Sequence, residues 1–240
     1  MWMVRSVTAR FMCLVVTAVL AGWCVVVTPI AAAGGYRTIT LTFVRHAQSE
    51  GNATGLIDTS TPGPALTELG RAQAVASAQR LAGNHYDGIF ASTMIRTQQT
   101  AQPMADALHE PVTVLPGLRE IEAGDYEGQP EADAVGTYFA APQQWLRGDR
   151  SARIPGSVDG NEFDARFDDA VQQIYDSGDV VPVVYSHGGA IMLWVAMNVT
   201  NSDPGLLVAH PLNNTDYVVV AGNPTNGWRL VDWNGVKSAA

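Results

Sequence analysis

The chain has 240 residues, a length that suits one globular domain with a complete hydrophobic core. Hydrophobic residues make up 47% of it and charged residues 15%, which excludes a disordered, collagen-like or coiled-coil chain. The net charge is −9 and no basic stretch offsets it, which argues against nucleic acid as a partner.

Lysine and cysteine usage removes two further classes of enzyme. The only lysine, Lys237, stands near the end of the sequence, whereas a P-loop NTPase needs a lysine at a helix start inside the domain. Both cysteines, Cys13 and Cys24, lie in an apolar N-terminal segment, so a cysteine-based phosphatase or protease is excluded. The acidic residues show no metal-ligand spacing, and we expect neither a metal nor another cofactor.

The first 33 residues are typical of an export signal. Arg5 and Arg10 precede an uncharged apolar run over 11–28, and Ala31 and Ala33 form an A-x-A cleavage site. We expect cleavage after Ala33, which would leave a domain over 34–240 in the secreted fraction or the cell envelope. Because the apolar run is at the short limit for spanning a bilayer, an uncleaved membrane anchor is the alternative, and it would be the only contact with a membrane.

After residue 34, apolar β-branched runs alternate with helical patterns. We expect strands over 38–44, 88–92, 111–115, 180–185, 216–221 and 228–233. We expect helices over 66–82, 94–108, 161–177 and 190–198, and a helical insertion near 129–160 that is helical over 129–147. Thr67 is the expected N-cap of the first of these helices, and Pro103 marks a kink or break in the second. The alternation predicts an α/β sheet with helices on both faces.

Charged and imidazole side chains follow four of these strands. Arg45 and His46 end the first, Arg96 follows the second, Glu120 lies beyond the third, and His187 follows the strand over 180–185. Ligands of such sheets bind at the carboxyl ends of the strands, so we expect these five side chains to converge on one rim.

The expected rim has the chemistry of an anion site. The planar fork of an arginine matches the oxygens of a phosphoryl group. Gly188 and Gly189 open a helix, and the free N–H groups at a helix N-terminus also favour an anion.

Five sequence motifs, in order along the chain, resemble those of the histidine phosphatase superfamily, in the branch that contains phosphoglycerate mutases. They are RHAQSEGN (45–52), LTELGRAQA (66–74), ASTMIRTQQTA (91–101), the LxExxxGxxEG block (118–128) and SHGG (186–189). Ala47 and Ala91 depart from the usual residues of the family, but both are small and leave the charged set intact. The resemblance implies a three-layer α/β/α sandwich with a mostly parallel sheet.

The resemblance also implies roles for the residues of these motifs. His46 would be the nucleophile that forms a phosphohistidine, and Glu120 the general acid and base. Glu120 is chosen over Glu122 on family spacing alone. The phosphoryl group would be bound by side chains and one backbone amide, namely Arg45, Asn52, Arg96, His187 and the N–H of Gly188.

Several side chains have plainer interpretations. Asn52 could also be an ordinary turn asparagine. Glu127 is interpreted as structural, and we expect His85, His109 and His210 to be surface or capping residues.

The function expected from these features is hydrolysis of a small phosphorylated substrate outside the cytoplasm. Phosphoryl transfer of the phosphoglycerate mutase type is one alternative, and a non-catalytic envelope protein is another. A third is an α/β-hydrolase, because Ser186 lies between a strand and a helix, with Asp203 and His210 later in the chain. The insertion, which contains Tyr138, Phe139, Trp145, Arg147, Arg150 and Arg153, is expected to cover the pocket and set the substrate. Neither that substrate nor the oligomeric state follows from the sequence.

Overall fold

The structure, a computed structural model, describes residues 36–237. The predicted signal segment, its cleavage site and its two cysteines therefore lie outside the described residues. Within 36–237, no helix combines the length and apolar character that crossing a membrane requires.

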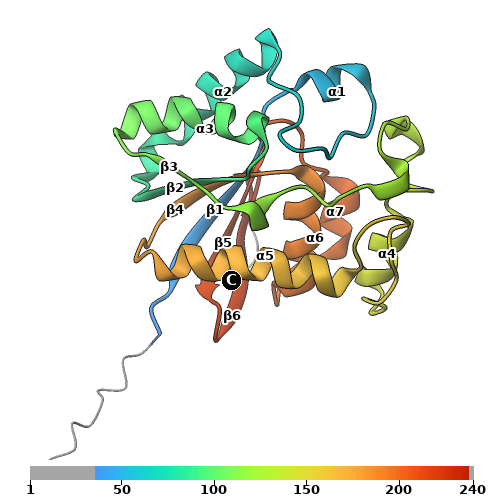
Figure 1. The fold of residues 1–240 in the computed structure, drawn as a ribbon. Helices are drawn as coiled ribbons and strands as arrows, with labels where there is room; N and C mark the ends of the chain where they lie inside the picture. The colour runs from blue at the N-terminus through green and yellow to red at the C-terminus, as the bar shows by residue number, and fades with distance from the viewer. Residues whose placement is uncertain (1–35, 238–240) are drawn as a thin grey trace, which may run out of the picture. The chain divides into compact units, whose positions relative to one another are not determined.

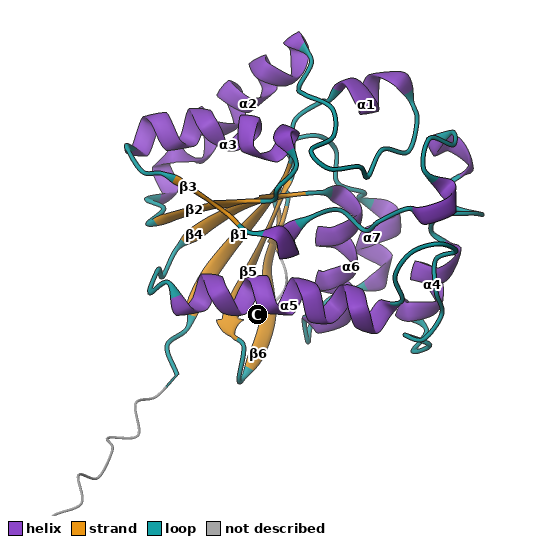
Figure 2. Cartoon of the chain, in the orientation of Figure 1, coloured by secondary structure: helices purple, strands orange, loops and turns teal. Residues whose placement is uncertain are grey.

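A seven-stranded sheet forms the centre of the described domain (Figures 1 and 2). Its strands are β1 (Ile39–Arg45), β2 (Gly88–Ala91), β3 (Val112–Val114), β4 (Pro182–Ser186), β5 (Tyr217–Asn223), β6 (Gly227–Trp233) and β7 (Val236–Lys237). They lie in the order β3-β2-β4-β1-β5-β6-β7. The first four in that order are mutually parallel, and β5, β6 and β7 extend the sheet through antiparallel pairs. The carboxyl ends of β1, β2 and β4 thus meet at one edge.

Helices cover both faces of this sheet, which confirms the predicted three-layer α/β/α sandwich (Figure 1). The helices are α1 (Glu50–Thr54), α2 (Glu68–Leu81), α3 (Ile95–Leu108), α4 (Ala140–Leu146), α5 (Gly160–Asp176), α6 (Gly188–Asn198) and α7 (Pro204–Ala209). Helices α2 and α3 pack on one face, and α5 and α6 pack on the other. The side chains of β1 divide between the two faces, because successive residues of a strand point to opposite sides.

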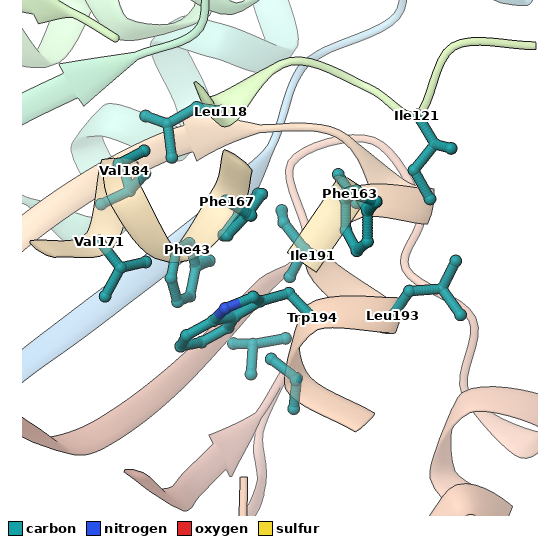
Figure 3. Close-up of a cluster of buried hydrophobic side chains, with 14 of the residues drawn as sticks. Phe43, Leu118, Ile121, Phe163, Phe167, Val171, Val184, Ile191, Leu193 and Trp194 are labelled. Carbon is teal, nitrogen blue, oxygen red and sulfur yellow. The ribbon is translucent and has the colours of Figure 1, made fainter. Parts of the chain in front are cut away.

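The larger core lies between the sheet and helices α5 and α6. Phe43 of β1 contacts Phe167 of α5 and Trp194 of α6, with ring centroids 5.9 and 5.3 Å away (Figure 3). All three side chains are fully buried. Such aromatic pairs add about 0.5–1.5 kcal/mol to the stabilisation that burial itself gives. This packing holds α6 against β1, and therefore sets where the first residues of α6 lie relative to His46.

Local signals decide where several helices begin. Thr67 is the N-cap of α2 as predicted, because its Oγ1 accepts a hydrogen bond from the N–H of Gly70. Asp159 caps α5 in the same way, and Glu162 completes a capping box. Pro103 lies inside α3 and does not end it.

One predicted helix differs from the structure, and three short elements were not predicted. The expected helix over 129–147 is a single 3-10 turn (Glu131–Asp133) followed by the short helix α4, and the rest of the insertion is irregular. Gly136, in the middle of this stretch, disfavours a continuous helix. The short elements α1, α7 and β7 were not predicted, since five, six or two residues carry too little periodicity to be recognised.

Candidate active site

His46 lies directly after β1 and is 4% exposed. Its Nδ1 is 2.8 Å from the backbone oxygen of Ala47, and a carbonyl can only accept, so Nδ1 carries the proton. The lone pair of the ring is therefore on Nε2, which accepts a hydrogen bond from Nε of Arg96 at 3.1 Å. This arrangement fixes both the tautomer and the direction of the nucleophilic nitrogen.

Arg96 reaches His46 from the first turn of α3. Its side chain is 3% exposed, and Nη2 donates to the carbonyl oxygen of Asp58 at 3.1 Å. Its Nη1 is buried and has no acceptor among the described residues.

Arg45 supplies a second guanidinium from the end of β1. Its Nη1 donates to the carbonyl oxygen of Leu212 at 2.5 Å, and its Nε is buried without an acceptor in residues 36–237. Buried donors without acceptors are uncommon in proteins, and a bound anion is one group that can satisfy them. Nη1 of Arg96 and Nε of Arg45 are two such donors beside one imidazole, which is an arrangement suited to a phosphoryl group.

His187 lies behind His46. The two ring centroids are 5.1 Å apart at an interplanar angle of 63°. Nε2 of His187 is 2.9 Å from Oγ of Ser92, while its Nδ1 is buried and has no partner in the described chain. The side chain of His187 is fully buried and does not line the cavity. It is therefore close to His46 but not exposed to the cavity.

Both histidines are held in the neutral form. Burial lowers the pKa of His46 well below its ordinary value of 6.5, and the positive charges of Arg96 and Arg45 lower that pKa further. Burial is also the main cause of the lowered pKa of His187, with Arg96 the next contribution. A neutral imidazole is the form that has a lone pair to donate.

Glu120 reaches the site from the segment after β3. Its carboxylate accepts hydrogen bonds from the N–H groups of Gly189 at 3.2 Å, Ala190 at 2.8 Å and Ile121 at 3.0 Å. It thereby caps α6, whose N-cap His187 gives no side-chain cap. Burial raises the pKa of Glu120 above its ordinary value of 4.5, although these hydrogen bonds and Arg96 lower it. The net rise favours the protonated carboxyl group more than in an exposed glutamate.

The structure separates Glu120 from Glu122, which the sequence could not do except by family spacing. Glu122 pairs with Arg119 at 2.7 Å and with Arg166 at 3.5 Å, and it does not line the cavity. Arg166 also donates to the backbone oxygen of Glu120 at 3.2 Å, and Tyr138 donates from its hydroxyl to the backbone oxygen of Ile121. Arg166 and Tyr138 thus both hold the backbone of residues 120–122, and of its two glutamates only Glu120 lines the cavity.

Asn52 stabilises the turn at the start of α1, and it also lines the cavity. Its Oδ1 accepts from the N–H and hydroxyl of Ser49 in the capping box of α1, and from Nδ2 of Asn214 at 3.2 Å. Because its oxygen is engaged, the amide NH₂ is the part that remains to donate to a ligand.

One cavity of about 820 Å³ joins these groups. Its wall includes six of the seven predicted site residues, namely Arg45, His46, Asn52, Arg96, Glu120 and Gly188. Gly188 is the first residue of α6, so its N–H has no acceptor within the helix. A Cβ at Gly188 would lie 3.3 Å from Cδ of Arg45, so the small residue allows this close approach.

Three residues that support the site were not singled out from the sequence. Ser92 contacts His187, Oγ1 of Thr100 accepts from the N–H of Ala47 at 3.0 Å, and Asn214 donates to the backbone oxygen of His46 at 3.0 Å. Ser92 and Thr100 lie within the third motif, so that motif could have indicated them. Asn214 lies in no motif, and only the fold shows its contact.

The residues predicted to lie outside the site are Glu127, His85, His109 and His210. Glu127 is structural, because its carboxylate accepts from the N–H and the hydroxyl of Thr59. His85, His109 and His210 are exposed residues at helix ends. No cluster of potential metal ligands occurs among residues 36–237.

The serine-nucleophile alternative is wrong. Ser186 is fully buried, and its Oγ donates to the backbone oxygen of Leu118 at 2.8 Å. His210, its only possible base, is an exposed residue at the end of α7.

Two solved phosphatase structures share this fold. The solved structure of a mycobacterial glucosyl-3-phosphoglycerate phosphatase in complex with VO3 superposes with a TM-score of 0.67. It is 25% identical and covers 82% of this chain and 100% of its own. A phosphoserine phosphatase from Entamoeba histolytica, in complex with 3-phosphoglyceric acid, has a TM-score of 0.66 at 23% identity, over 82% of this chain and 98% of its own.

Sequence relatives agree with this fold. The PE-PGRS family protein PE_PGRS11 of Mycobacterium tuberculosis is 45% identical over 219 residues, which are 85% of this chain. This chain spans only 38% of that relative's length. GpmB of Yersinia pestis, a probable phosphoglycerate mutase, is 32% identical over 153 residues, which are 62% of this chain and 69% of GpmB.

The chain belongs to the histidine phosphatase superfamily, branch 1, whose family model matches residues 41–235. The family and the glucosyl-3-phosphoglycerate phosphatase neighbour support an enzyme domain that acts on phosphate monoesters.

Proposed function

We propose that this protein is an exported phosphomonoester hydrolase that works through a covalent phosphohistidine on His46. The observation that carries the proposal is the orientation of His46, whose Nδ1 is held by the Ala47 carbonyl and whose Nε2 faces Arg96. Glu120 lies on the wall of the same cavity. A nucleophile, two phosphate-binding guanidinium groups and a proton donor are thus present together.

In the first displacement, Nε2 of His46 attacks phosphorus and the bond from phosphorus to the ester oxygen breaks. Protonated Glu120 gives its proton to the leaving alkoxide, which departs as the alcohol. Arg45, Arg96 and the N–H of Gly188 would bind the three remaining oxygens and the charge on them. The proton on Nδ1 stays in its hydrogen bond to Ala47, which stabilises the cationic phosphohistidine.

In the second displacement, water attacks phosphorus and the N–P bond breaks. The ionised Glu120 takes a proton from that water, which restores its acid form. Inorganic phosphate leaves, and His46 returns to its neutral state. The NH₂ of Asn52, which lines the cavity, would donate to the phosphoryl group, whereas His187 lies behind His46 and outside the cavity wall.

The phosphoglycerate mutase alternative receives less support from the cavity. Its usual substrate carries a carboxylate beside the phosphate, and the wall beyond Arg45 and Arg96 contains only one further cation, Arg147, together with the anions Asp58 and Glu131. A site with so few cations favours release of the phosphoryl group to water over its transfer to a charged acceptor.

Trapping of the phosphoenzyme tests the mechanism. Rapid quenching with a ³²P-labelled phosphoester should give a protein-bound label that is stable to base and labile to acid. His46→Ala should carry no label and turn over at background rate, whereas His210→Ala, at an exposed histidine, should match the wild type. An enzyme that turns over with no label on His46 would overturn the mechanism, and one with no hydrolase activity on any monoester would favour the non-catalytic alternative.

Export is a separate part of the proposal, motivated by Arg5, Arg10, the apolar run and the Ala31-x-Ala33 site. Protein recovered from outside the cytoplasmic membrane should begin at Gly34. A chain that keeps residues 1–33 in the membrane fraction would instead support the anchor, and full-length protein confined to the cytosol would contradict both.

A further inference from the structure

The cavity wall contains two chemically different sets of side chains. One set is made of the polar and charged groups described above. The other is a set of apolar side chains, which we call the outer wall: Leu56, Val135, Phe139, Leu146 and Met192. They come from the loop after α1, the segment before α4, the end of α4, and α6.

Three members of the outer wall are unusually exposed for apolar residues. Val135 is 70% exposed, Leu56 43% and Leu146 41%. Singly exposed apolar side chains are common, but their gathering around one cavity from separate segments indicates a surface that becomes covered by a ligand.

The proposed reaction places the alcohol part of the substrate against this wall. In phosphoryl transfer, the attacking and leaving oxygen or nitrogen atoms lie on opposite sides of phosphorus. The ester oxygen therefore points away from Nε2 of His46, and Glu120 must reach it. Everything attached to that oxygen extends beyond Glu120, toward the outer wall, and a cavity of about 820 Å³ leaves room for a group of considerable size.

We infer that the substrates are monophosphates of uncharged, largely apolar alcohols, with an alkyl or aryl group held by the outer wall. This inference rests on the proposed phosphohydrolase function. A charged alcohol such as a phosphoglycerate would need its own cation, and Arg147 shares the cavity with Glu131. A sugar would need many hydrogen-bonding groups, whereas the outer wall is apolar and residues 131–147 add only Glu131, Gln143 and Arg147 as charged or amide side chains. Each methylene buried there should improve binding about threefold to fourfold.

A chain-length series with the full-length enzyme tests this. The ratio kcat/KM should rise about threefold per methylene from methyl to hexyl phosphate, and pentyl phosphate should exceed glycerol 1-phosphate, which has an equal number of non-hydrogen atoms in its alcohol, by more than tenfold. A flat series, or a preference for glycerol 1-phosphate, phosphoserine or 3-phosphoglycerate while hydrolysis proceeds, would overturn the inference and leave the proposed function standing.

Variants locate the effect. Val135→Asp should reduce the ratio of the hexyl to the methyl kcat/KM by at least tenfold, because a carboxylate replaces apolar surface at the wall. Val75→Asp, at a residue of α2 that is 46% exposed and outside the cavity, should leave that ratio unchanged. If both variants change the ratio equally, the wall is not the site of discrimination and the inference fails.

A binding measurement keeps the two proposals distinguishable. Alkylphosphonates cannot be hydrolysed, so their Kd reports the cavity without any chemistry. Hexylphosphonate should bind at least tenfold more tightly than methylphosphonate, and Val135→Asp should remove that difference. If hexylphosphonate binds more tightly but no ester is hydrolysed, the proposed hydrolase function is wrong and the apolar binding site is supported. If hexylphosphonate and methylphosphonate have equal Kd values, the apolar binding site is wrong, whether or not the enzyme hydrolyses esters.

Discussion

Nε of Arg96 donates a hydrogen bond of 3.1 Å to Nε2 of His46, across a separation of 50 residues in the chain. The proposed nucleophile is therefore held by one of the groups proposed to bind the phosphate. When a phosphoryl group enters, its oxygens can accept from Arg96, and the lone pair of His46 is then released toward phosphorus. In the proposed mechanism, the contact orients Nε2, and the charge of Arg96 lowers the pKa of His46 and so favours its unprotonated form.

Removal of Arg96 should damage both binding and chemistry. We expect Arg96→Ala to lower kcat by about 10²–10³, the loss typical of one preorganised donor in a transition state. Arg96→Lys should recover little of it, because lysine lacks the planar fork. Steady-state kinetics with phenyl phosphate would measure this, with Arg229→Ala as the control at an exposed residue of β6. A full-rate Arg96→Ala enzyme would show that the phosphate binds elsewhere.

Glu120→Gln should reveal a proton donor through its dependence on the leaving group. The variant keeps the nucleophile but cannot protonate the alkoxide, so alkyl esters should lose far more rate than p-nitrophenyl phosphate, whose leaving group needs no proton. In the wild type, kcat/KM for alkyl esters should fall as pH rises through the pKa of Glu120, which burial raises above 4.5. The Gln variant should lack that alkaline decline. Equal losses for both ester classes, with the decline retained, would assign the proton to another group.

The two buried histidines should make the fold sensitive to acid. Burial holds the pKa values of His46 and His187 below the value of 6.5 that an unfolded chain has. The unfolded state therefore binds more protons, and the stabilisation present above pH 6.5 is lost as the pH falls below it. Each histidine should contribute about 1.4 kcal/mol per pH unit to the slope of the free energy of unfolding.

Chemical denaturation between pH 5 and 7 would measure this slope. His187→Gln should lower it, by up to about 1.4 kcal/mol per pH unit at the acidic end of this range. His109→Gln, at an exposed histidine, is the matched control and should leave it unchanged. A His187→Gln slope equal to that of the wild type would mean that His187 is protonated in the folded state.

Gly189→Ala should separate activity from stability. A Cβ at this position would lie 2.9 Å from Oε1 of Glu120, so the carboxylate must move. A misplaced catalytic group of this kind costs about tenfold to a hundredfold in kcat. Alanine is the better helix former by up to about 1 kcal/mol, so the free energy of unfolding should not fall in parallel. Gly83→Ala, where a Cβ meets nothing within 4 Å, should alter neither quantity. Unchanged kcat in Gly189→Ala would show that the position of Glu120 is not critical.

Much of the fold followed from local pattern. The strand over 38–44, which the structure has as Ile39–Arg45, and the helix capped by Thr67 were predicted because an apolar β-branched run and an N-cap act within a few residues. Convergence of Arg45, His46 and Arg96 followed from one rule, that parallel strands place their carboxyl ends at one edge of a sheet. The motifs around these residues then indicated the family, which the family model over 41–235 confirms.

Tertiary structure alone decided what the individual side chains contact. Glu120 and Glu122 are two residues apart, yet only Glu120 caps α6, whose amides are about 70 residues away in the chain. The insertion shows the same dependence. Trp145 is 2% exposed and packs on Phe163, Arg150 pairs with Asp164, and of the insertion's arginines only Arg147 lines the cavity. Sequence patterns report periodicity and local chemistry, whereas contacts between distant segments depend on how the helices pack on the sheet, and that packing set which residues face the substrate.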